Sequence, residues 1–262
     1  MSGSLDGRVA LVTGAGRGIG RAVAKALAAQ GAQTVVASRT AGTVEAVVAE
    51  IEAAGDTAFG VTVDVGTRPA VEAMVAEAVG RFGTVDILVN AAQSFGLPGR
   101  GEQAPAYRPL ETFPDDLWEH IFDTGLRASL WAMQAAFPHM VAGGYGRILN
   151  FGSGNSFLAV EGTVAYNANK EAIRVLTRTA AREWGQHGIT ANVIVPLIET
   201  DAFTGYMEEK PGMRDHLLNT IPVRRIGTDS DVGPLFVFLC GEGSSYLTGG
   251  TYMLTGGAIN VP

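Results

Sequence analysis

Near its start the chain has an apolar run, a turn of closely spaced glycines and an amphipathic segment, and this succession constrains the fold more than any other feature. The run is residues 9–12 (VALV), and the turn is residues 13–20 (TGAGRGIG). Apolar residues then recur at the three- and four-residue spacing of a helix, at Ile19, Val23, Ala26 and Leu27. A strand, a glycine turn and a helix in this order can bind a pyrophosphate, because glycine lets the backbone approach the ligand and the new helix presents free N–H groups. An ordinary loop is the alternative, but the place of the turn between strand and helix favours dinucleotide binding.

The composition is typical of a globular α/β protein. Of the 262 residues, 47% are hydrophobic and 17% charged, which is enough to bury a large core. The formal net charge is −7 and no block is dense in lysine or arginine, so we expect no nucleic-acid surface. The sequence has no long apolar run that would span a membrane, no secretory signal at its amino terminus, and a single cysteine, Cys240. We therefore expect a cytoplasmic protein without a disulfide.

Apolar runs and amphipathic segments alternate along the chain and predict a parallel sheet with helices on both faces. Strands are predicted at residues 8–13, 34–37, 58–63, 85–90, 146–152, 190–195 and 251–254. Helices are predicted at residues 18–30, 44–54, 68–82, 115–142, 163–186 and 231–240. Gly31, Gly55 and Gly83 follow the first three helices, where a left-handed cap favours glycine. We find no linker, so residues 1–262 are predicted to form one doubly wound α/β domain of about seven strands.

Two segments interrupt this alternation and are predicted to be substrate loops, near residues 94–112 and 197–222. Both follow predicted strands, and ligands of such sheets bind beyond the carboxyl ends of the strands. Several apolar side chains in these and neighbouring loops would suit an apolar or cyclic ketone or alcohol, although they could equally close the loops onto the core. They are Phe95, Leu97, Phe157, Leu158, Phe203, Tyr206, Met207 and Met213.

A tyrosine and a lysine lie four residues apart in the predicted helix 163–186, on one face of it. A tyrosine of pKa about 10 is a poor acid–base group at neutral pH unless a nearby cation stabilises its phenolate. Lys170 is placed to supply that cation to Tyr166. Ser153 ends the predicted strand 146–152, where its hydroxyl could hold a substrate oxygen. Alone, the pair is equally compatible with two residues that merely share a helix face.

Together with the glycine turn, these residues resemble the short-chain dehydrogenase/reductase family, and the likeness covers nearly the whole chain. Residues 13–20 resemble the family's TGxxxGxG turn, and Ser153, Tyr166 and Lys170 match its serine and YxxxK pair at the family spacing. Asp64 and Val65 resemble the pair that holds the adenine. Residues 90–92 resemble a variant of the family's NNAG strand end.

The resemblance implies a Rossmann-type domain that exchanges a hydride between a nicotinamide and a carbonyl or alcohol carbon. Tyr166 would be the general acid or base, Ser153 would orient the substrate oxygen, and Lys170 would bind the nicotinamide ribose and lower the pKa of the tyrosine. The resemblance and the glycine turn together assign cofactor binding to Gly14, Arg17, Gly18, Ile19, Gly20, Ser38, Arg39, Asp64, Val65, Asn90, Tyr166, Lys170, Pro196, Ile198 and Thr200. No metal site is expected, because none of the four histidines has the spacing of a metal pair.

The end of the predicted strand 34–37 favours NADP(H) over NAD(H). An acidic residue there would bind the ribose hydroxyls and repel a 2′-phosphate. This chain has Ser38 and Arg39 instead, and Arg17 in the glycine turn adds a second cation. The planar guanidinium donates hydrogen bonds in pairs and so suits a phosphate. The alternatives are a solvated Arg39, or an Arg39 stacked on the adenine of NAD.

Four positions depart from the family pattern. Gly125 lies in the predicted helix 115–142 where the family has an asparagine that helps relay protons, and glycine in a helix interior predicts a local irregularity. Gln93 replaces the last glycine of NNAG. Residues 196–200 lack a glycine and are one residue shorter than in the family, and Ile198 and Thr200 are expected to keep the nicotinamide contacts. Thr255 stands where an aspartate is usual.

The leading hypothesis is an NADP(H)-dependent reductase or dehydrogenase for a small carbonyl or secondary alcohol. One alternative is an NAD-linked alcohol dehydrogenase of the same family. Another is a degenerate nucleotide-binding regulatory or scaffold protein, and a third is a family member whose cofactor serves a non-redox step such as dehydration or epimerisation. The resemblance also implies a homodimer or homotetramer.

Overall fold

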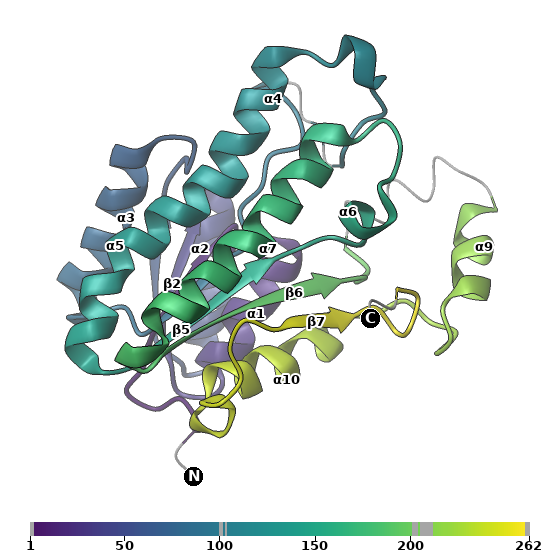
Figure 1. Cartoon of the computed structure of the whole chain (residues 1–262). Helices are drawn as coiled ribbons and strands as arrows, with labels where there is room; N and C mark the ends of the chain where they lie inside the picture. Colours follow the sequence, from purple (N-terminus) through teal and green to yellow (C-terminus); the bar gives the residue numbers. More distant parts are fainter. Residues whose placement is uncertain (1–2, 100–101, 103, 201–203, 205–211, 260–262) are drawn as a thin grey trace.

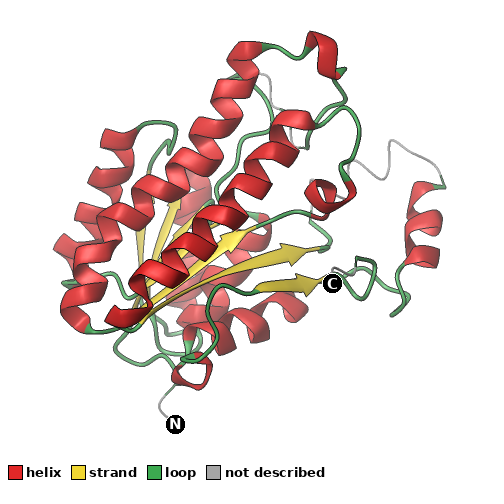
Figure 2. Ribbon diagram, in the orientation of Figure 1, coloured by secondary structure: helices red, strands yellow, loops and turns green. Residues whose placement is uncertain are grey.

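Parallel strands form the central layer of the protein, in the order β3-β2-β1-β4-β5-β6-β7 among the described residues. The computed structural model describes residues 3–99, 102, 104–200, 204 and 212–259. The strands are β1 (Val9–Thr13), β2 (Gln33–Ser38), β3 (Ala58–Thr62), β4 (Ile87–Asn90), β5 (Gly146–Phe151), β6 (Ile189–Pro196) and β7 (Thr251–Leu254). Figures 1 and 2 show this sheet as a single layer with helices packed against both of its faces. The predicted doubly wound α/β domain is confirmed.

Each face of the sheet buries its own core. On one face the strands pack against α1 (Gly18–Ala28), α2 (Ala41–Ala53) and α10 (Asp229–Cys240). On the other they pack against α3 (Arg68–Phe82), α5 (Ala128–Gly143) and α7 (Val164–Trp184). Every residue of β1, β4 and β5 is buried, which explains why these strands are mostly apolar rather than alternating.

The order of strands reverses between β1 and β4. β1 pairs in parallel with β2 on one side and with β4 on the other, although β4 follows three crossovers later in the chain. The loops after β1 and β4 therefore diverge to opposite faces of the sheet and leave a crevice between them at its carboxyl edge. The topology thus places the glycine turn beside the loop that begins at Ala91.

The predicted strands and helices agree with the structure to within a few residues, with two exceptions. The helix expected at 115–142 is not continuous: α4 (Asp115–Phe122) and α5 are separated by a π-helical turn, Asp123–Arg127. This is the irregularity that a glycine in the helix interior predicts. A short helix that the sequence does not indicate, α6 (Gly154–Leu158), follows β5. The described part of residues 197–222 contains α9 (Met213–Thr220).

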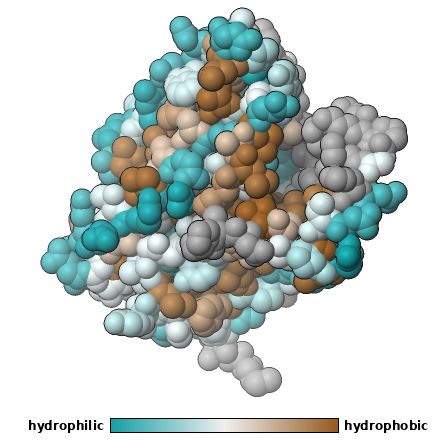
Figure 3. Space-filling view, turned by 45° about the vertical axis from the view of Figure 1, so that its right-hand side comes forward, coloured by the Kyte–Doolittle hydropathy of each residue, from teal (hydrophilic) through white to brown (hydrophobic). Residues whose placement is uncertain are grey.

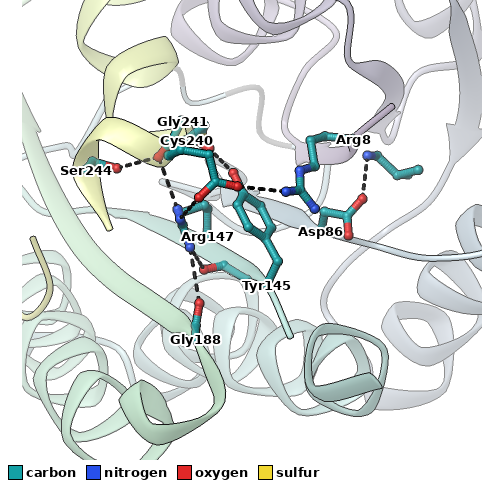
Figure 4. Close-up of polar contacts among 11 residues, drawn as sticks. Arg8, Asp86, Tyr145, Arg147, Gly188, Cys240, Gly241 and Ser244 are labelled. Carbon is teal, nitrogen blue, oxygen red and sulfur yellow. Dashed lines mark hydrogen bonds and ion pairs between the residues drawn. The ribbon is translucent and has the colours of Figure 1, made fainter. Parts of the chain in front are cut away.

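A cluster of charged and aromatic side chains joins the sheet to the end of α10, as Figure 4 shows. The ring of Tyr145 lies between two guanidinium groups, 3.5 Å from that of Arg8 and 4.0 Å from that of Arg147, measured to the ring centroid. The Tyr145 hydroxyl donates to the carbonyl oxygen of Cys240, and Arg8 forms a 2.8 Å ion pair with Glu242. We call these four side chains, Arg8, Tyr145, Arg147 and Glu242, the arginine clamp. Its members come from the amino-terminal edge of the sheet and from the segment after α10.

Arg147 is expected to carry most of the stabilisation that the clamp provides. Its side chain is 2% exposed and donates to the carbonyl oxygens of Gly146 and Gly188 at 2.9 and 3.2 Å. Replacement by methionine fills the space but removes both hydrogen bonds that the buried cation donates, so we expect Arg147→Met to lower the free energy of unfolding by about 2–4 kcal/mol. Urea denaturation measures it. The half-exposed Arg8 is the matched control, and an equal loss in Arg8→Met would contradict the assignment.

The surface carries scattered apolar side chains. Figure 3 shows a band of apolar residues running down one face of the molecule between polar ones. Large apolar residues that are well exposed include Val141 on α5, Leu158 on α6 and Val175 on α7. None of the helices that the structure describes combines the length and the apolar character needed to cross a membrane.

Candidate active site

A cavity of about 320 Å³ opens at the carboxyl edge of the sheet, over the crevice between β1 and β4. Its walls come from the loops that follow six different strands, β1 to β6. Most of the predicted site residues line it: Gly14, Arg17, Gly18, Ile19, Gly20, Ser38, Arg39, Asp64, Val65, Tyr166, Lys170, Pro196 and Thr200. The fold therefore brings residues that are up to 186 positions apart in the sequence, from Gly14 to Thr200, into one site.

The glycine turn packs too closely for side chains. Gly14 has a positive φ of 66°, and a Cβ there would lie 2.8 Å from the backbone nitrogen of Ala92. A Cβ on Gly20 would collide with the carbonyl oxygen of Gly14. The hydroxyl of Thr13 accepts hydrogen bonds from the backbone N–H groups of Ala91 and Ala92, at 3.1 and 3.2 Å. β1 and β4 are thereby fixed together directly beneath the start of α1, whose free N–H groups face the cavity.

Two arginines give one end of the cavity a positive character. Arg17 immediately precedes α1, and Arg39 follows β2; both side chains are exposed and neither has an ion pair or hydrogen bond with a described residue. Ser38, the last residue of β2, lines the same cavity. Asp64 is on the same wall, where its carboxylate accepts a hydrogen bond from the backbone of Gly66. This end of the cavity offers two guanidinium groups and a hydroxyl to an anionic ligand.

Tyr166 and Lys170 project from α7 into the other end of the cavity. The Lys170 Nζ lies 5.6 Å from the centroid of the Tyr166 ring. The centroid of the Phe95 ring lies 5.5 Å from that of the Tyr166 ring. Burial raises the pKa of Tyr166, while a hydrogen bond with Ser153 lowers it in part. Burial lowers the pKa of Lys170 to about 8. The pair therefore forms a partly desolvated acid–base site.

Ser153 is held by the short helix α6. Its hydroxyl oxygen accepts a 3.2 Å hydrogen bond from the backbone N–H of Asn155 and so caps the helix. Because that oxygen is an acceptor for the backbone, its proton is free to be donated toward Tyr166 or a ligand oxygen. The capping role explains why α6 begins directly after β5.

The low pKa of Lys170 makes the stability of the protein depend on pH. The folded-state pKa of about 8 lies below the ordinary 10.5, so between these values the unfolded chain binds more protons than the folded one. The free energy of unfolding should therefore rise with pH, by roughly 1.4 kcal/mol per unit from about pH 8 to pH 10. Urea denaturation across this range measures it. Lys170→Met should abolish the slope, and an unchanged slope in that variant would assign it to another group.

Three predicted site residues do not line the described wall of the cavity. Asn90 ends β4 and donates a 2.8 Å hydrogen bond to the side chain of Asn150 beneath the site. Ser153 does not line this wall but forms a hydrogen bond with Tyr166, which does. Ile198 is buried in the core, and its backbone pairs with that of Gly227 in an isolated bridge. Its side chain belongs to the core on the α1 face of the sheet and not to the described wall of the cavity.

The predicted substrate residues fall in different places. Phe95 lines the cavity, Leu97 lines a smaller pocket beside α4, and Phe157 packs under the guanidinium of Arg174 on α7. Leu158 is exposed. Phe203, Tyr206 and Met207 lie outside the described residues, as does the side chain of Met213.

The cavity also contains residues that were not assigned a role from the sequence. Ala91, Ala92 and Gln93, the variant NNAG strand end, line it after β4, together with Ser94. Phe151 and Gly152 after β5 and Thr124 from the π-helical turn also line it, and nothing in the sequence identifies which of these side chains face a ligand. Among the described residues, no group of three or more potential metal-ligating side chains lies together.

Comparison with known proteins gives consistent results. The sequence model of the short chain dehydrogenase family matches residues 8–211. The short-chain reductase protein NovJ of Streptomyces niveus is 39% identical over 258 residues, which are 95% of this chain and 93% of NovJ.

Two solved structures share the fold over almost their whole length. A gluconate 5-dehydrogenase from Burkholderia cenocepacia J2315, in complex with NADP and tartrate, has a TM-score of 0.87 and 32% identity, covering 97% of this chain and 96% of that one. A 3-oxoacyl (acyl-carrier-protein) reductase from Agrobacterium tumefaciens C58 with NADP bound has a TM-score of 0.87 and 30% identity, covering 97% and 95%.

Proposed function

Since this chain belongs to the short-chain dehydrogenase family, we propose that it transfers a hydride between NADP(H) and the carbonyl or secondary alcohol carbon of a small organic substrate. The observation that carries the proposal is the placement of Tyr166 and Lys170 in one cavity with the glycine turn and two arginines. The glycine turn fits a dinucleotide. Gly14 and Gly20 line the cavity where a pyrophosphate would meet the start of α1, and the backbone there is packed too closely for any side chain at these positions. When bound, the nicotinamide supplies or accepts the hydride.

The protein's own part in the reaction is to move a proton. In the direction of reduction, Tyr166 donates its hydroxyl proton to the substrate oxygen, and Ser153 donates a hydrogen bond to the same oxygen. Lys170, when protonated, stabilises the phenolate that remains, which offsets the unfavourable effect of burial on that charge. Phe95 excludes water from one side of the tyrosine and favours an apolar substrate.

The charged end of the cavity supports NADP(H) over NAD(H). Arg39 and Arg17 have no described ionic partner and line the cavity together with Ser38, so a 2′-phosphate bound there would find two guanidinium donors and a hydroxyl. The two similar structures described above contain NADP. In the alternative, Arg39 stacks on the adenine of NAD. The ribose hydroxyls of NAD would then have no acidic residue at the end of β2 to accept their hydrogen bonds, because Ser38 stands there.

Cofactor oxidation tests the proposed function. The purified protein is mixed with NADPH and, in turn, with cyclohexanone, acetophenone and the polar control pyruvate, and the loss of NADPH absorbance is followed. Steady consumption with a ketone supports the proposal, and the same rate with NADH would favour the NAD-linked alternative. NADPH binding without consumption across a broad panel of ketones and alcohols would favour a regulatory or non-redox protein.

We further propose that the apolar surface of α5 and α7 pairs with a second copy of the chain. Val141 and Val175 are exposed there, and homo-oligomers bury such faces on symmetric axes. Light scattering coupled to size-exclusion chromatography is expected to give a dimer or tetramer. A monomeric mass at micromolar concentration would contradict it.

A further inference from the structure

The break between α4 and α5 lies beside the acid–base pair and is held by side chains from outside the helix. In a continuous α-helix the N–H of Leu126 would bond to the carbonyl of Phe122, and the carbonyl of Ile121 would accept from Gly125. Here the Leu126 N–H donates to Asn169 Oδ1 at 2.8 Å, and the Ile121 carbonyl accepts from Gln93 Nε2 at 3.3 Å. The helix opens into a π turn because two amide side chains are inserted into its hydrogen-bond ladder.

The two amides are bonded to each other. Asn169 Nδ2 donates to Gln93 Oε1 at 2.8 Å, and Gln93 Nε2 also donates to the carbonyl of Ser94 at 2.8 Å. We call Gln93 and Asn169 the amide bridge. It joins three elements, because Gln93 follows β4, Asn169 belongs to α7, and the π turn interrupts the helix that packs over both. Asn169 is completely inaccessible and Gln93 is partly buried.

Position 125 accepts only glycine while the bridge is present. A Cβ there would lie 2.5 Å from Gln93 Oε1 and 2.6 Å from Asn169 Oδ1, closer than atoms can approach. The space that a side chain at 125 would fill is therefore occupied by the amides at 93 and 169. Thr124 and Ser129 complete the turn by donating to the carbonyls of His120 and Gly125, each at 2.8 Å.

We propose that the amide bridge positions Lys170 for the reaction, by locking α7 to the π turn and to the end of β4. Asn169 precedes Lys170 and lies one helical turn after Tyr166, so a rotation of α7 that displaced its amide would displace both reacting side chains. Gln93 and Thr124 line the same cavity as Lys170, so the Gln93 end of the bridge is part of the cavity wall. The proposal rests on the function proposed above, since it assigns Lys170 a part in that reaction.

The effect of the amide bridge on Lys170 can be measured through the pKa of that lysine, because few other charged side chains line the described wall of the cavity. The other ionisable side chains that line the cavity are Tyr166 on the same helix, Arg17 before α1, and Arg39 and Asp64 at the far end. None of them belongs to the bridge, which is neutral. A change at Gln93 or Asn169 therefore alters the pKa of Lys170 only by moving it or by admitting water.

Asn169→Ala is the main test, with Asn167→Ala as the matched control. Asn167 is on the same helix and donates a 2.9 Å hydrogen bond to the carbonyl of Val160, away from the π turn. We expect kcat for ketone reduction to fall by about 10–100-fold in Asn169→Ala, with KM for the ketone changed less than about threefold, since a displacement of about 1 Å suffices for such a loss. The pKa of Lys170, read by NMR of labelled lysine and assigned with Lys170→Met, should rise from about 8 toward 10.5. Asn167→Ala should change neither quantity.

Rescue separates positioning from general damage. In the Asn169→Ala background the space of the Asn169 amide is vacated, and Gln93 Oε1 loses the partner that holds it beside position 125. Gly125→Asn can then displace Gln93 and place an amide where that of Asn169 was, and it should restore at least about a tenth of the wild-type kcat. Gly125→Asn alone should lower the melting temperature, because its Cβ meets the intact bridge. An unchanged kcat and Lys170 pKa in Asn169→Ala, or a loss that Gly125→Asn does not reduce, overturns the proposal.

The Lys170 titration also distinguishes the two proposals. If the wild-type protein reduces no ketone but Asn169→Ala still raises the pKa of Lys170, the proposed function fails and the control of Lys170 by the bridge stands. If the wild-type protein is active and the pKa and kcat are unchanged in Asn169→Ala, the bridge proposal fails alone.

Discussion

Replacing Tyr166 with phenylalanine is expected to lower kcat by about 10²–10⁴-fold while leaving the affinity for NADPH nearly unchanged. The variant retains the ring that packs against Phe95 but lacks the hydroxyl that would give its proton to the substrate. It also loses only one described polar contact, the hydrogen bond with Ser153, so the fold should be preserved. Steady-state NADPH consumption with the best ketone measures the rate, and fluorescence titration measures the binding.

The control for this prediction is Tyr107→Phe. Tyr107 is 66% exposed and does not line the described wall of the cavity, so removal of its hydroxyl should leave kcat within about twofold of wild type. A fall of less than tenfold in Tyr166→Phe would show that the proton comes from another group or from water. The proposed roles of Ser153 and Lys170 would then also have to be abandoned.

Arg39→Asp should invert the cofactor preference. The substitution removes a guanidinium that can bind a 2′-phosphate and places a carboxylate at the end of β2, where it repels that phosphate and can accept hydrogen bonds from ribose hydroxyls. We expect the dissociation constant of NADPH to rise by about 100-fold, equivalent to about 2.7 kcal/mol, and that of NADH to fall or stay constant. Fluorescence titrations with both nucleotides at low and high salt measure the change, which salt should reduce.

Arg81→Asp makes the same change in net charge at a remote place. Arg81 lies in the last turn of α3, at the edge of the sheet opposite the cavity, and is exposed. If both variants weaken NADPH binding equally, the effect is one of overall charge and Arg39 reads no phosphate. If neither does, the cofactor preference must come from Arg17, Ser38 or residues outside the described wall.

The fold was predictable because its signals are local. The buried strands are mostly apolar, the helices keep a three- and four-residue spacing, and Gly31, Gly55 and Gly83 end helices with φ values of 88–91°. Each of these patterns lies within one continuous stretch of the chain. An irregularity at Gly125 could be predicted from the sequence. That it is a π turn could not, because the side chains that cause it come from two other segments.

The site was predictable where chemistry requires particular residue types at fixed spacing. The glycine turn, Tyr166 and Lys170 are such residues, and the structure brings them to one cavity. Ile198 was assigned to the site by resemblance, yet its side chain is buried in the core, since the direction of the chain after Pro196 depends on its bridge to Gly227. The pairing of Gln93 with Asn169 could not be read from the sequence, because it depends on the approach of residues 76 positions apart.

The hydrogen bonds from Ala91 and Ala92 to Thr13 have a consequence for the way the protein is made. They join residues 78 and 79 positions apart, so the wall of the glycine turn is absent until β4 has docked beside β1. As synthesis proceeds from the amino terminus, the glycines leave the ribosome well before that wall does. A nascent chain halted before residue 91 contains every glycine of the turn but lacks the wall that packs against it. A folding step much later in the chain, the docking of β4, completes that wall.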